Sequence, residues 1–242
     1  MPPFLSIERL SKYFAGLAAL KEVSFEVAEG QICGLIGPNG AGKTTLFSII
    51  AGSVSPTSGK VSFQGANVTH WKSFRAVRAG VIRTHQITRP FRSMTTRENI
   101  EVALHFGRAR GSGASDKEIP KILEQTGLTR VADVLAETLC VGDQKRLELA
   151  RTIATRPKLL LCDEVCGGLT ESEMNDVLEL LKRIREQGTT ILYVEHNMRA
   201  IMSVCDQVVV LNFGEKLTEG PPAQIQNDAA VVEAYLGKCS VD

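Results

Sequence analysis

Short apolar runs, each bounded by Gly, Pro, Ser or Asn, follow one another along the first part of the chain. They cover residues 4–10, 23–27, 31–37 and 60–65, and runs of this length and spacing predict β-strands joined by turns. We expect these strands to form one small mixed sheet. A helix-compatible stretch that begins at Thr44 separates the third strand from the fourth.

The pattern becomes helical from about Thr95 to Arg151, on both sides of a segment rich in Gly and Ser. We interpret this stretch as a helical insertion. Beyond it, apolar runs at 158–162 and 189–194 flank a predicted helix at 171–188. Such alternation is typical of parallel strands with crossover helices.

The predicted helix at 171–188 has one apolar face, which we assign to core packing rather than to a ligand. Its members are Met174, Val177, Leu178, Leu181 and Ile184. The tail, 207–237, predicts a strand, a turn, a second short strand and a helix. We therefore expect one α/β domain over residues 1–242, with its parts at 1–94, 95–151 and 152–242.

Composition narrows the class of partner. Of 242 residues, 43% are hydrophobic and 23% charged, as in a globular protein with a substantial core. The 28 basic and 27 acidic side chains give a net charge of +1, so we expect no nucleic-acid partner.

Six scattered cysteines predict reduced thiols, mostly in the core; they are Cys33, Cys140, Cys162, Cys166, Cys205 and Cys239.

Neither a secretory signal nor a membrane span is predicted. The first ten residues lack a basic region followed by a long apolar stretch, and no apolar run approaches the roughly 18 residues of a span. We expect a cytosolic protein that reaches a membrane through a partner.

Residues 37–45 read GPNGAGKTT, the phosphate-loop pattern GxxxxGK followed by Thr. The apolar strand before the loop and the helix after it let backbone N–H groups converge on phosphate oxygens. This context outweighs the alternative of a glycine-rich turn with a solvated lysine. We expect Lys43 to reach the β- and γ-phosphates of ATP and the Thr44 hydroxyl to bind Mg²⁺. The predicted nucleotide site comprises Gly37, Pro38, Asn39, Gly40, Ala41, Gly42, Lys43, Thr44 and Thr45.

Two adjacent acids, Asp163 and Glu164, end the apolar run at 158–162. Ligands gather at the carboxyl ends of parallel strands. Asp163 suits a Mg²⁺ ligand, directly or through water, and Glu164 suits the base that activates or positions the attacking water. Alone the pair would be an ordinary strand end, but the phosphate loop makes it a candidate site.

Two further side chains are candidates for sensing the γ-phosphate. His196 follows the apolar run 189–194 and can bond this phosphate or orient the attacking water, although a histidine at a strand end is usually structural. Gln86 lies between the first α/β part and the helical insertion, where its amide can bind Mg²⁺ or water. From spacing alone, a surface glutamine is the better interpretation of Gln86.

The order of these motifs, with the segment LCVGDQKRLELAR at 139–151, resembles the ATPases of ABC transporters over nearly the whole chain. Softer likenesses at 14–20, 81–100 and 231–237 resemble the branched-chain amino-acid import ATPases. The resemblance implies an α/β phosphate-loop NTPase (RecA-like) core with an N-terminal antiparallel β subdomain and an α-helical insertion.

The resemblance also assigns residues. It implies that Phe14 stacks on adenine, with Tyr13 as the competing choice, although an aromatic near a strand end is more often packing. It places a signature loop at 139–143, where Cys140 and Gly142 bind the ATP held by a second subunit. Gly142 permits close backbone approach, and the helix that follows points its N-terminus at the γ-phosphate.

Several residues depart from the family pattern. Cys140, Val141 and Asp143 stand where Ser, Gly and Gln are usual. A carboxylate near a triphosphate is repelled, so we expect Asp143 either to turn away or to pair with Lys145 or Arg146. Val165 and Thr170 replace a Pro and an Asp near the acid pair without removing the base or the metal ligand. We expect hydrolysis to survive.

The resemblance implies a motor of two such chains, identical or homologous, bound to two membrane permease subunits and served indirectly by a solute-binding protein. It would sit at the cytoplasmic face of the plasma membrane and power uptake of branched-chain amino acids or a related amino acid or amide. A soluble ABC ATPase without a transport role is the main alternative, and a small-molecule kinase is a second.

A basic cluster lies around Gln86, where the family docks its permease subunits; it comprises Arg83, Arg89, Arg92 and Arg97. A solvated basic face is the equal alternative.

Overall fold

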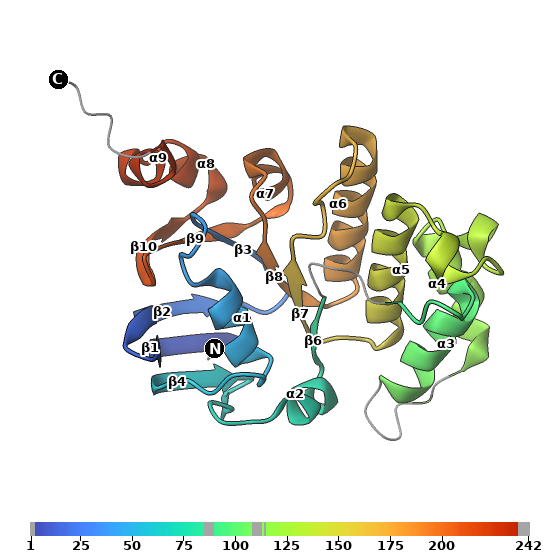
Figure 1. Cartoon of the computed structure of the whole chain (residues 1–242), viewed down its shortest axis with the longest axis horizontal. Coiled ribbons are helices and arrows are strands. Elements are labelled where there is room, and N and C mark those ends of the chain that lie inside the picture. The colour runs from blue at the N-terminus through green and yellow to red at the C-terminus, as the bar shows by residue number, and fades with distance from the viewer. Residues whose placement is uncertain (1–2, 85–89, 108–112, 114, 237–242) are drawn as a thin grey trace.

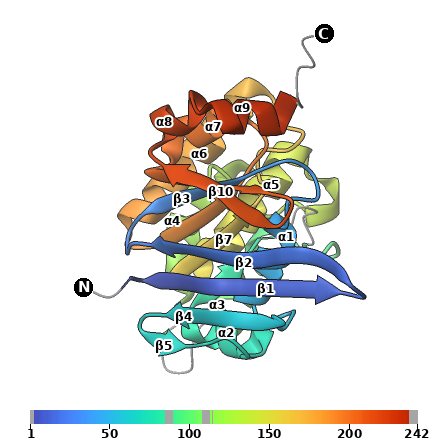
Figure 2. The same cartoon turned by 90° about the vertical axis from the view of Figure 1, so that its left-hand side faces the viewer.

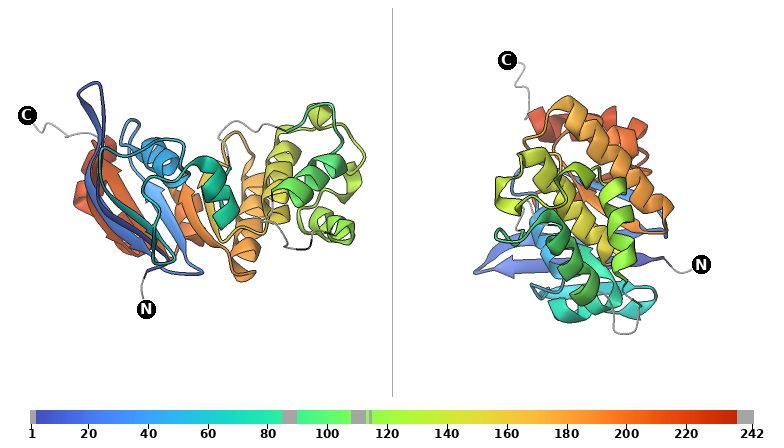
Figure 3. Two further views of the ribbon diagram at one scale, coloured as in Figure 1. Left: turned by 90° about the horizontal axis from the view of Figure 1, so that it is seen from below. Right: turned by 90° about the vertical axis from the view of Figure 1, so that its right-hand side faces the viewer.

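The computed structural model describes residues 3–84, 90–107, 113 and 115–236. Two β-sheets lie at one end of the molecule, and a group of helices forms the other end (Figures 1 and 3). The strands of the first sheet are β1 (Leu5–Phe14), β2 (Leu17–Val27), β4 (Ser58–Phe63) and β5 (Ala66–Asn67). Those of the second are β3 (Ile32–Ile36), β6 (Val81–Arg83), β7 (Leu159–Asp163), β8 (Thr190–Val194), β9 (Gln207–Asn212) and β10 (Glu215–Gly220).

The first sheet is antiparallel throughout, in the order β2-β1-β4-β5. The single mixed sheet predicted for residues 4–65 is therefore wrong, because β3 leaves this sheet for the other. All five residues of β3 are buried, whereas β1 and β2 mix buried with exposed positions. A strand that is apolar on both faces suits the interior of a parallel sheet.

The second sheet runs β10-β9-β3-β8-β7-β6 (Figure 1), and Figure 2 shows the first sheet face on, with β1 between β2 and β4. Its strands are parallel except for β10, which pairs antiparallel with β9. The parallel strands predicted at 158–162 and 189–194 are confirmed as β7 and β8, which pair directly. Because β3, β7 and β8 are neighbours, the loops that follow them meet at one edge of the sheet.

Helices cover both faces of the second sheet. Helix α1 (Lys43–Ile50) packs between the two sheets in a core that includes Leu46, Phe47 and Leu35. On the other face lie α6 (Glu171–Glu186) and α7 (Met198–Val204). The apolar face predicted for the helix at 171–188 is confirmed, because all five of its members are buried in α6.

The helical end of the molecule has its own core. It contains α3 (Thr96–Phe106), α4 (Ile119–Gln125) and α5 (Val141–Ala154), together with three short 3-10 turns, and its buried side chains include Ile100, Leu123 and Leu147. A capping box between Thr95 and Glu98 starts α3. The boundary predicted after residue 151 falls inside α5, which continues to Ala154.

Some elements have no counterpart in the sequence prediction. They include α2 (Ser73–Ala79), the short strands β5 and β6, and the division of the tail helix into α8 (Pro222–Gln226) and α9 (Ala229–Leu236). Within the described residues, no helix is both long and apolar enough to span a bilayer.

Candidate functional site

The phosphate loop joins β3 to α1 and is shaped by glycines. Gly37 has a φ of 148°, and a Cβ there would lie 2.1 Å from the carbonyl oxygen of Leu211 in β9. Gly42 has a φ of 101°, and its Cβ would lie 2.5 Å from the carbonyl oxygen of Ala19 in β2. Only glycine fits these positions, since both the backbone angle and the space exclude a side chain.

Neighbouring strands enclose the loop. The amide of Gly214, in the turn between β9 and β10, donates to the carbonyl of Ala41 at 3.2 Å. The carbonyl of Gly214 accepts from the amide of Lys21 in β2 at 2.7 Å. The loop is thus bonded to the turn between β9 and β10, and this turn is also bonded to β2 of the other sheet.

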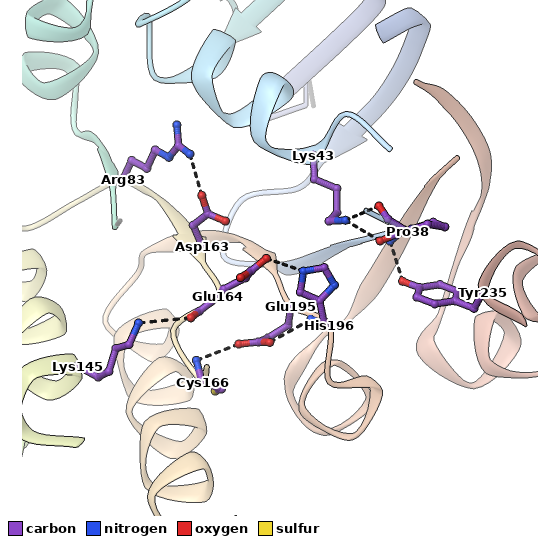
Figure 4. A network of polar contacts seen from close by, with 11 residues as sticks. Pro38, Lys43, Arg83, Lys145, Asp163, Glu164, Cys166, Glu195, His196 and Tyr235 are labelled. Carbon is purple, nitrogen blue, oxygen red and sulfur yellow. Dashed lines mark hydrogen bonds and ion pairs between the residues drawn. The ribbon is translucent and has the colours of Figure 1, made fainter. Parts of the chain in front are cut away.

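Lys43 begins α1 and lies along the inside of the loop. Its ammonium donates to the carbonyl oxygens of Gly37 at 2.6 Å and Pro38 at 2.9 Å (Figure 4). Burial lowers the pKa of Lys43, and the nearby carboxylates of Glu164 and Asp163 oppose that shift. The first turn of α1 has no acidic residue, so its N-terminus and Lys43 together make a site for an anion.

Asp163 ends β7 and is held by an arginine. Arg83 of β6 donates from Nη2 to Asp163 Oδ2 at 2.7 Å and from Nη1 to Ser48 Oγ at 3.0 Å. Both charged side chains are largely buried. Arg83 therefore points into the site in Figure 4 rather than contributing to the basic surface proposed for the cluster around Gln86.

Glu164 follows Asp163 and contacts His196 from the end of the neighbouring strand β8. The distance from His196 Nε2 to Glu164 Oε1 is 2.5 Å. Glu164 has a φ of +48°, a left-handed conformation that costs energy in a residue with a side chain. Its amide donates to the carbonyl of Val194 at 2.9 Å, which holds the strained residue against β8. Asp163, Glu164 and His196, which the sequence predicted beside the phosphate loop, thus lie close together at the ends of β7 and β8.

Two contacts at this site have no signal in the local sequence. The amide of Gly37 donates to the hydroxyl of Tyr235 in α9 at 2.8 Å, and burial raises the pKa of that hydroxyl. The buried carboxylate of Glu195 accepts from the amides of Cys166 and His196. Tyr235 lies 198 residues along the chain from Gly37, so no spacing rule points to it.

The Tyr235 contact gives a testable prediction. Tyr235→Phe removes the hydroxyl that holds the first residue of the phosphate loop, at a cost of about 1 kcal/mol. We expect ADP binding, measured with a fluorescent analogue, to weaken about fivefold. Val232→Ala, on an exposed position of the same helix, should leave the affinity unchanged. Equal affinity of Tyr235→Phe and the unsubstituted chain would contradict the prediction.

Phe14 and Tyr13, the two adenine candidates, end β1 just before a two-residue turn at Ala15 and Gly16. Both rings are about half exposed, at 47% for Phe14 and 46% for Tyr13. The ammonium of Lys12 lies 4.8 Å from the centre of the Phe14 ring. Successive residues of a strand face opposite sides, so one of the two rings faces away from any ligand bound by the other.

The signature loop leads into α5, far along the chain from the phosphate loop. Cys140 is the exposed N-cap residue of α5 and makes no side-chain capping bond. A Cβ at Gly142 would lie 2.5 Å from Glu173 Oε1 of α6, so a side chain there would displace Glu173. Cys140 and Val141 are exposed at the start of this helix, whereas Gly142 and Asp143 behind them are buried.

Asp143 is neutralised by a residue that the sequence prediction did not consider. The sequence left two alternatives, that Asp143 turns away or that it pairs with Lys145 or Arg146. In the structure Arg130 donates from Nη2 to both carboxylate oxygens of Asp143, at 2.7 and 2.9 Å. Arg146 instead pairs with Asp176 of α6, and Lys145 donates to the carbonyl of Glu164 at 3.5 Å. The side chain of Asp143 turns inward, toward the short turn that carries Arg130.

We expect Arg130→Ala to destabilise the chain by about 1 kcal/mol, because it leaves the buried Asp143 carboxylate without this partner. Solvent screens the pair, since 61% of the Arg130 side chain is exposed. Urea denaturation followed by circular dichroism measures the change. Lys121→Ala, at an exposed position of α4, is the matched surface variant, and equal stabilities of the two variants would refute the expectation.

Three residues with predicted assignments, Gln86, Arg89 and Cys239, fall outside the part of the chain that the structure describes. Of the other cysteines, Cys33, Cys162, Cys166 and Cys205 are buried thiols, which confirms their predicted place in the core, and Cys140 is exposed.

Three features together define a nucleotide-hydrolysing cassette. They are the phosphate loop after β3, the acidic pair at the end of β7 in the same sheet, and the separate helical end whose helix α5 begins with a glycine-containing turn. Residues 20–167 match the family model described as ABC transporter, and residues 215–238 match the model described as Branched-chain amino acid ATP-binding cassette transporter. The chain belongs to the ABC transporter ATPase family.

Relatives and solved structures agree with this assignment. The high-affinity branched-chain amino acid transport ATP-binding protein BraF of Pseudomonas aeruginosa is 38% identical, over 98% of each chain. The ADP conformation of MJ1267, an ATP-binding cassette of an ABC transporter, superposes with a TM-score of 0.87 at 28% identity, over 98% of this chain and 100% of that one. A dimeric post-hydrolysis state of the cassette MJ0796, bound to ADP and Pi, has a TM-score of 0.80 at 25% identity, over 90% and 98%.

Proposed function

We propose that this chain is the ATP-hydrolysing motor subunit of an importer for branched-chain amino acids or a closely related amino acid or amide. The observation that carries the proposal is the meeting of Lys43, Asp163, Glu164 and His196 at one edge of the parallel sheet (Figure 4). The match of residues 215–238 to the branched-chain family model supports the choice of branch.

ATP binds with its phosphates in the loop between β3 and α1. Lys43 exchanges its bonds to the loop carbonyls for bonds to phosphate oxygens, and the amides at the start of α1 bind the remaining charge. Phe14, or Tyr13 in its place, offers an exposed aromatic face to the adenine.

The donor groups fit a magnesium ion. The exposed Thr44 hydroxyl lies in the first turn of α1, and the Asp163 carboxylate ends β7, which gives the oxygen ligands that Mg²⁺ prefers. Gln86 is assigned as a third ligand from the sequence. When bound, the ion neutralises charge that develops on the β- and γ-phosphates.

Glu164 is the general base in this proposal. Its carboxylate takes the proton of the water that attacks the γ-phosphorus, and His196 holds the carboxylate and the γ-phosphate in register. The contact between His196 and Glu164 and the strained backbone of Glu164 support these roles. The bond between the γ-phosphorus and the bridging oxygen breaks, and ADP and phosphate are released.

Two such cassettes act together. The signature loop of one chain, with Cys140 and Gly142, covers the γ-phosphate held by the phosphate loop of the other, so ATP closes the pair and hydrolysis opens it. The exposure of Cys140 at the start of α5 supports this arrangement. Closure moves two permease subunits at the cytoplasmic face of the plasma membrane, and a solute-binding protein delivers the amino acid to them.

The proposal is tested by uptake of radiolabelled leucine, isoleucine and valine into cells that lack the chromosomal gene. We expect the plasmid-borne chain to restore uptake and the hydrolysis-deficient Glu164→Gln variant not to restore it. The tagged chain, isolated from gently solubilised membranes, should bring two permease subunits and a second cassette. Recovery with soluble complexes and unchanged uptake of all three amino acids would favour a soluble ABC ATPase instead.

A further inference from the structure

A buried carboxylate lies between the two segments that carry the proposed base and its histidine. Glu195 follows β8 directly, and 5% of the residue is exposed. Its Oε1 accepts from the amide of Cys166 at 2.9 Å, and its Oε2 accepts from the amide of His196 at 3.0 Å (Figure 4). The chemistry proposed above makes no use of this side chain.

Both donors belong to the catalytic segments. Cys166 is two residues after Glu164, in the turn that follows β7, and His196 is the residue that contacts Glu164 through its ring. The side-chain contact between Glu164 and His196 and the two backbone contacts of Glu195 therefore close a ring. The ends of β7 and β8 are therefore joined through the reacting side chains and through Glu195 behind them, in addition to the hydrogen bond from the Glu164 amide to the Val194 carbonyl.

A carboxylate is required for this double contact. Burying a charged group is costly unless hydrogen bonds compensate, and each oxygen of Glu195 has one backbone donor. A glutamine would offer one acceptor oxygen and one NH₂ group, and the NH₂ group would face an amide N–H. The isosteric amide thus breaks one side of the connection while it keeps the volume.

The Cys166 thiol beside Glu195 is not a reactive group that Glu195 could serve. Cys166 Sγ lies 3.3 Å from the hydroxyl of Tyr193, and burial raises the pKa of this thiol to about 12. The thiol therefore stays protonated at neutral pH and is a poor nucleophile. Glu195 also interacts with this thiol and helps to raise its pKa. Its hydrogen bond from the Cys166 amide, however, acts on the peptide chain.

We propose that Glu195 is a positioning residue for ATP hydrolysis, which sets the distance between Glu164 and His196 by holding the backbone of both segments. The inference rests on the roles proposed for those two residues. It predicts that Glu195 affects the chemical step more than the binding of ATP, because its contacts lie behind the base and away from the phosphate loop.

The test is Glu195→Gln, measured in the assembled transporter in proteoliposomes. We expect kcat for ATP hydrolysis to fall on the order of tenfold while KM for ATP changes less than about twofold. In the His196→Ala background, the same substitution should change kcat by less than about twofold, because the residue through which it acts is gone. Glu186→Gln, at an exposed position near the end of α6, should match the unsubstituted protein.

A second measurement begins with the unsubstituted chain, and that part of it does not depend on the variant folding. In the unsubstituted chain, the amide protons of Cys166 and His196 should exchange slowly with solvent, and in Glu195→Gln at least one should exchange faster. Rapid exchange of both in the unsubstituted chain would overturn the proposal. A kcat of Glu195→Gln within twofold of the unsubstituted protein would also overturn it, as would a joint loss of ATP affinity and melting temperature.

A different set of results would show that the roles proposed for Glu164 and His196 are wrong. If Glu164→Gln and His196→Ala hydrolyse ATP normally, the proposed base and its histidine are wrong, whatever Glu195→Gln does. If those two variants lose activity and Glu195→Gln keeps it, the positioning role alone is wrong.

Discussion

Glu164→Gln is expected to lower ATP hydrolysis by about 10³-fold, the range of a lost general base, while ATP still binds. The amide keeps the volume of the side chain and an oxygen for the contact with His196, so the geometry of the site survives. Without a base to take its proton, the attacking water does not react at a useful rate. ATP then remains between two cassettes, and the closed pair should accumulate.

The measurement is light scattering of the purified variant with ATP and Mg²⁺, together with phosphate release. We expect a dimer for Glu164→Gln and a monomer after ADP replaces ATP. Glu186→Gln serves as the matched glutamate-to-glutamine control at an exposed position. Phosphate release at the normal rate by Glu164→Gln would remove Glu164 from the role of base.

Lys43→Ala is expected to weaken ATP binding about 100-fold or more, because it removes charge-assisted bonds worth about 3 kcal/mol or more in sum to the phosphates. The stability of the nucleotide-free chain should change little. The substitution loses two bonds to the loop carbonyls, but it also removes the cost of burying an ammonium, which is what lowers the pKa of Lys43.

Isothermal titration calorimetry with ATP gives the affinity, and thermal melting gives the stability. Lys60→Ala removes an exposed lysine of the antiparallel sheet and should bind ATP as the unsubstituted chain does. If Lys43→Ala binds ATP within threefold of that control, the phosphates are not held by this lysine.

The sequence predicted the parts of the fold that depend on local pattern. The order of strand, glycine loop and helix around Lys43 is local, as is the apolar face of α6, and the structure has both. The place of Asp163 and Glu164 at the end of β7 also followed from one apolar run. Parallel strands in one sheet then brought His196 to Glu164.

The long-range pairing of strands and side chains was not predicted from the sequence, because no local signal specifies it. The assignment of β3 to the second sheet depends on which distant strands flank it. Arg83 is basic like its neighbours, and its turn toward Asp163 depends on the pairing of β6 with β7. Asp143 pairs with Arg130 because the helical end of the molecule folds back on itself. Lys145, which is closer to Asp143 in the sequence, donates instead to the carbonyl of Glu164.

The enclosure of the phosphate loop has a consequence for biosynthesis. The loop occupies residues 37–45, but its walls include Leu211 and Gly214, and the amide of Gly37 is held by Tyr235. A nascent chain that carries the complete loop motif therefore lacks the surfaces that shape it until about 190 further residues have left the ribosome. A product that stalls before Leu211 and Gly214 are made is therefore expected to consume no ATP, whereas one that lacks only Tyr235 is expected to bind nucleotide more weakly.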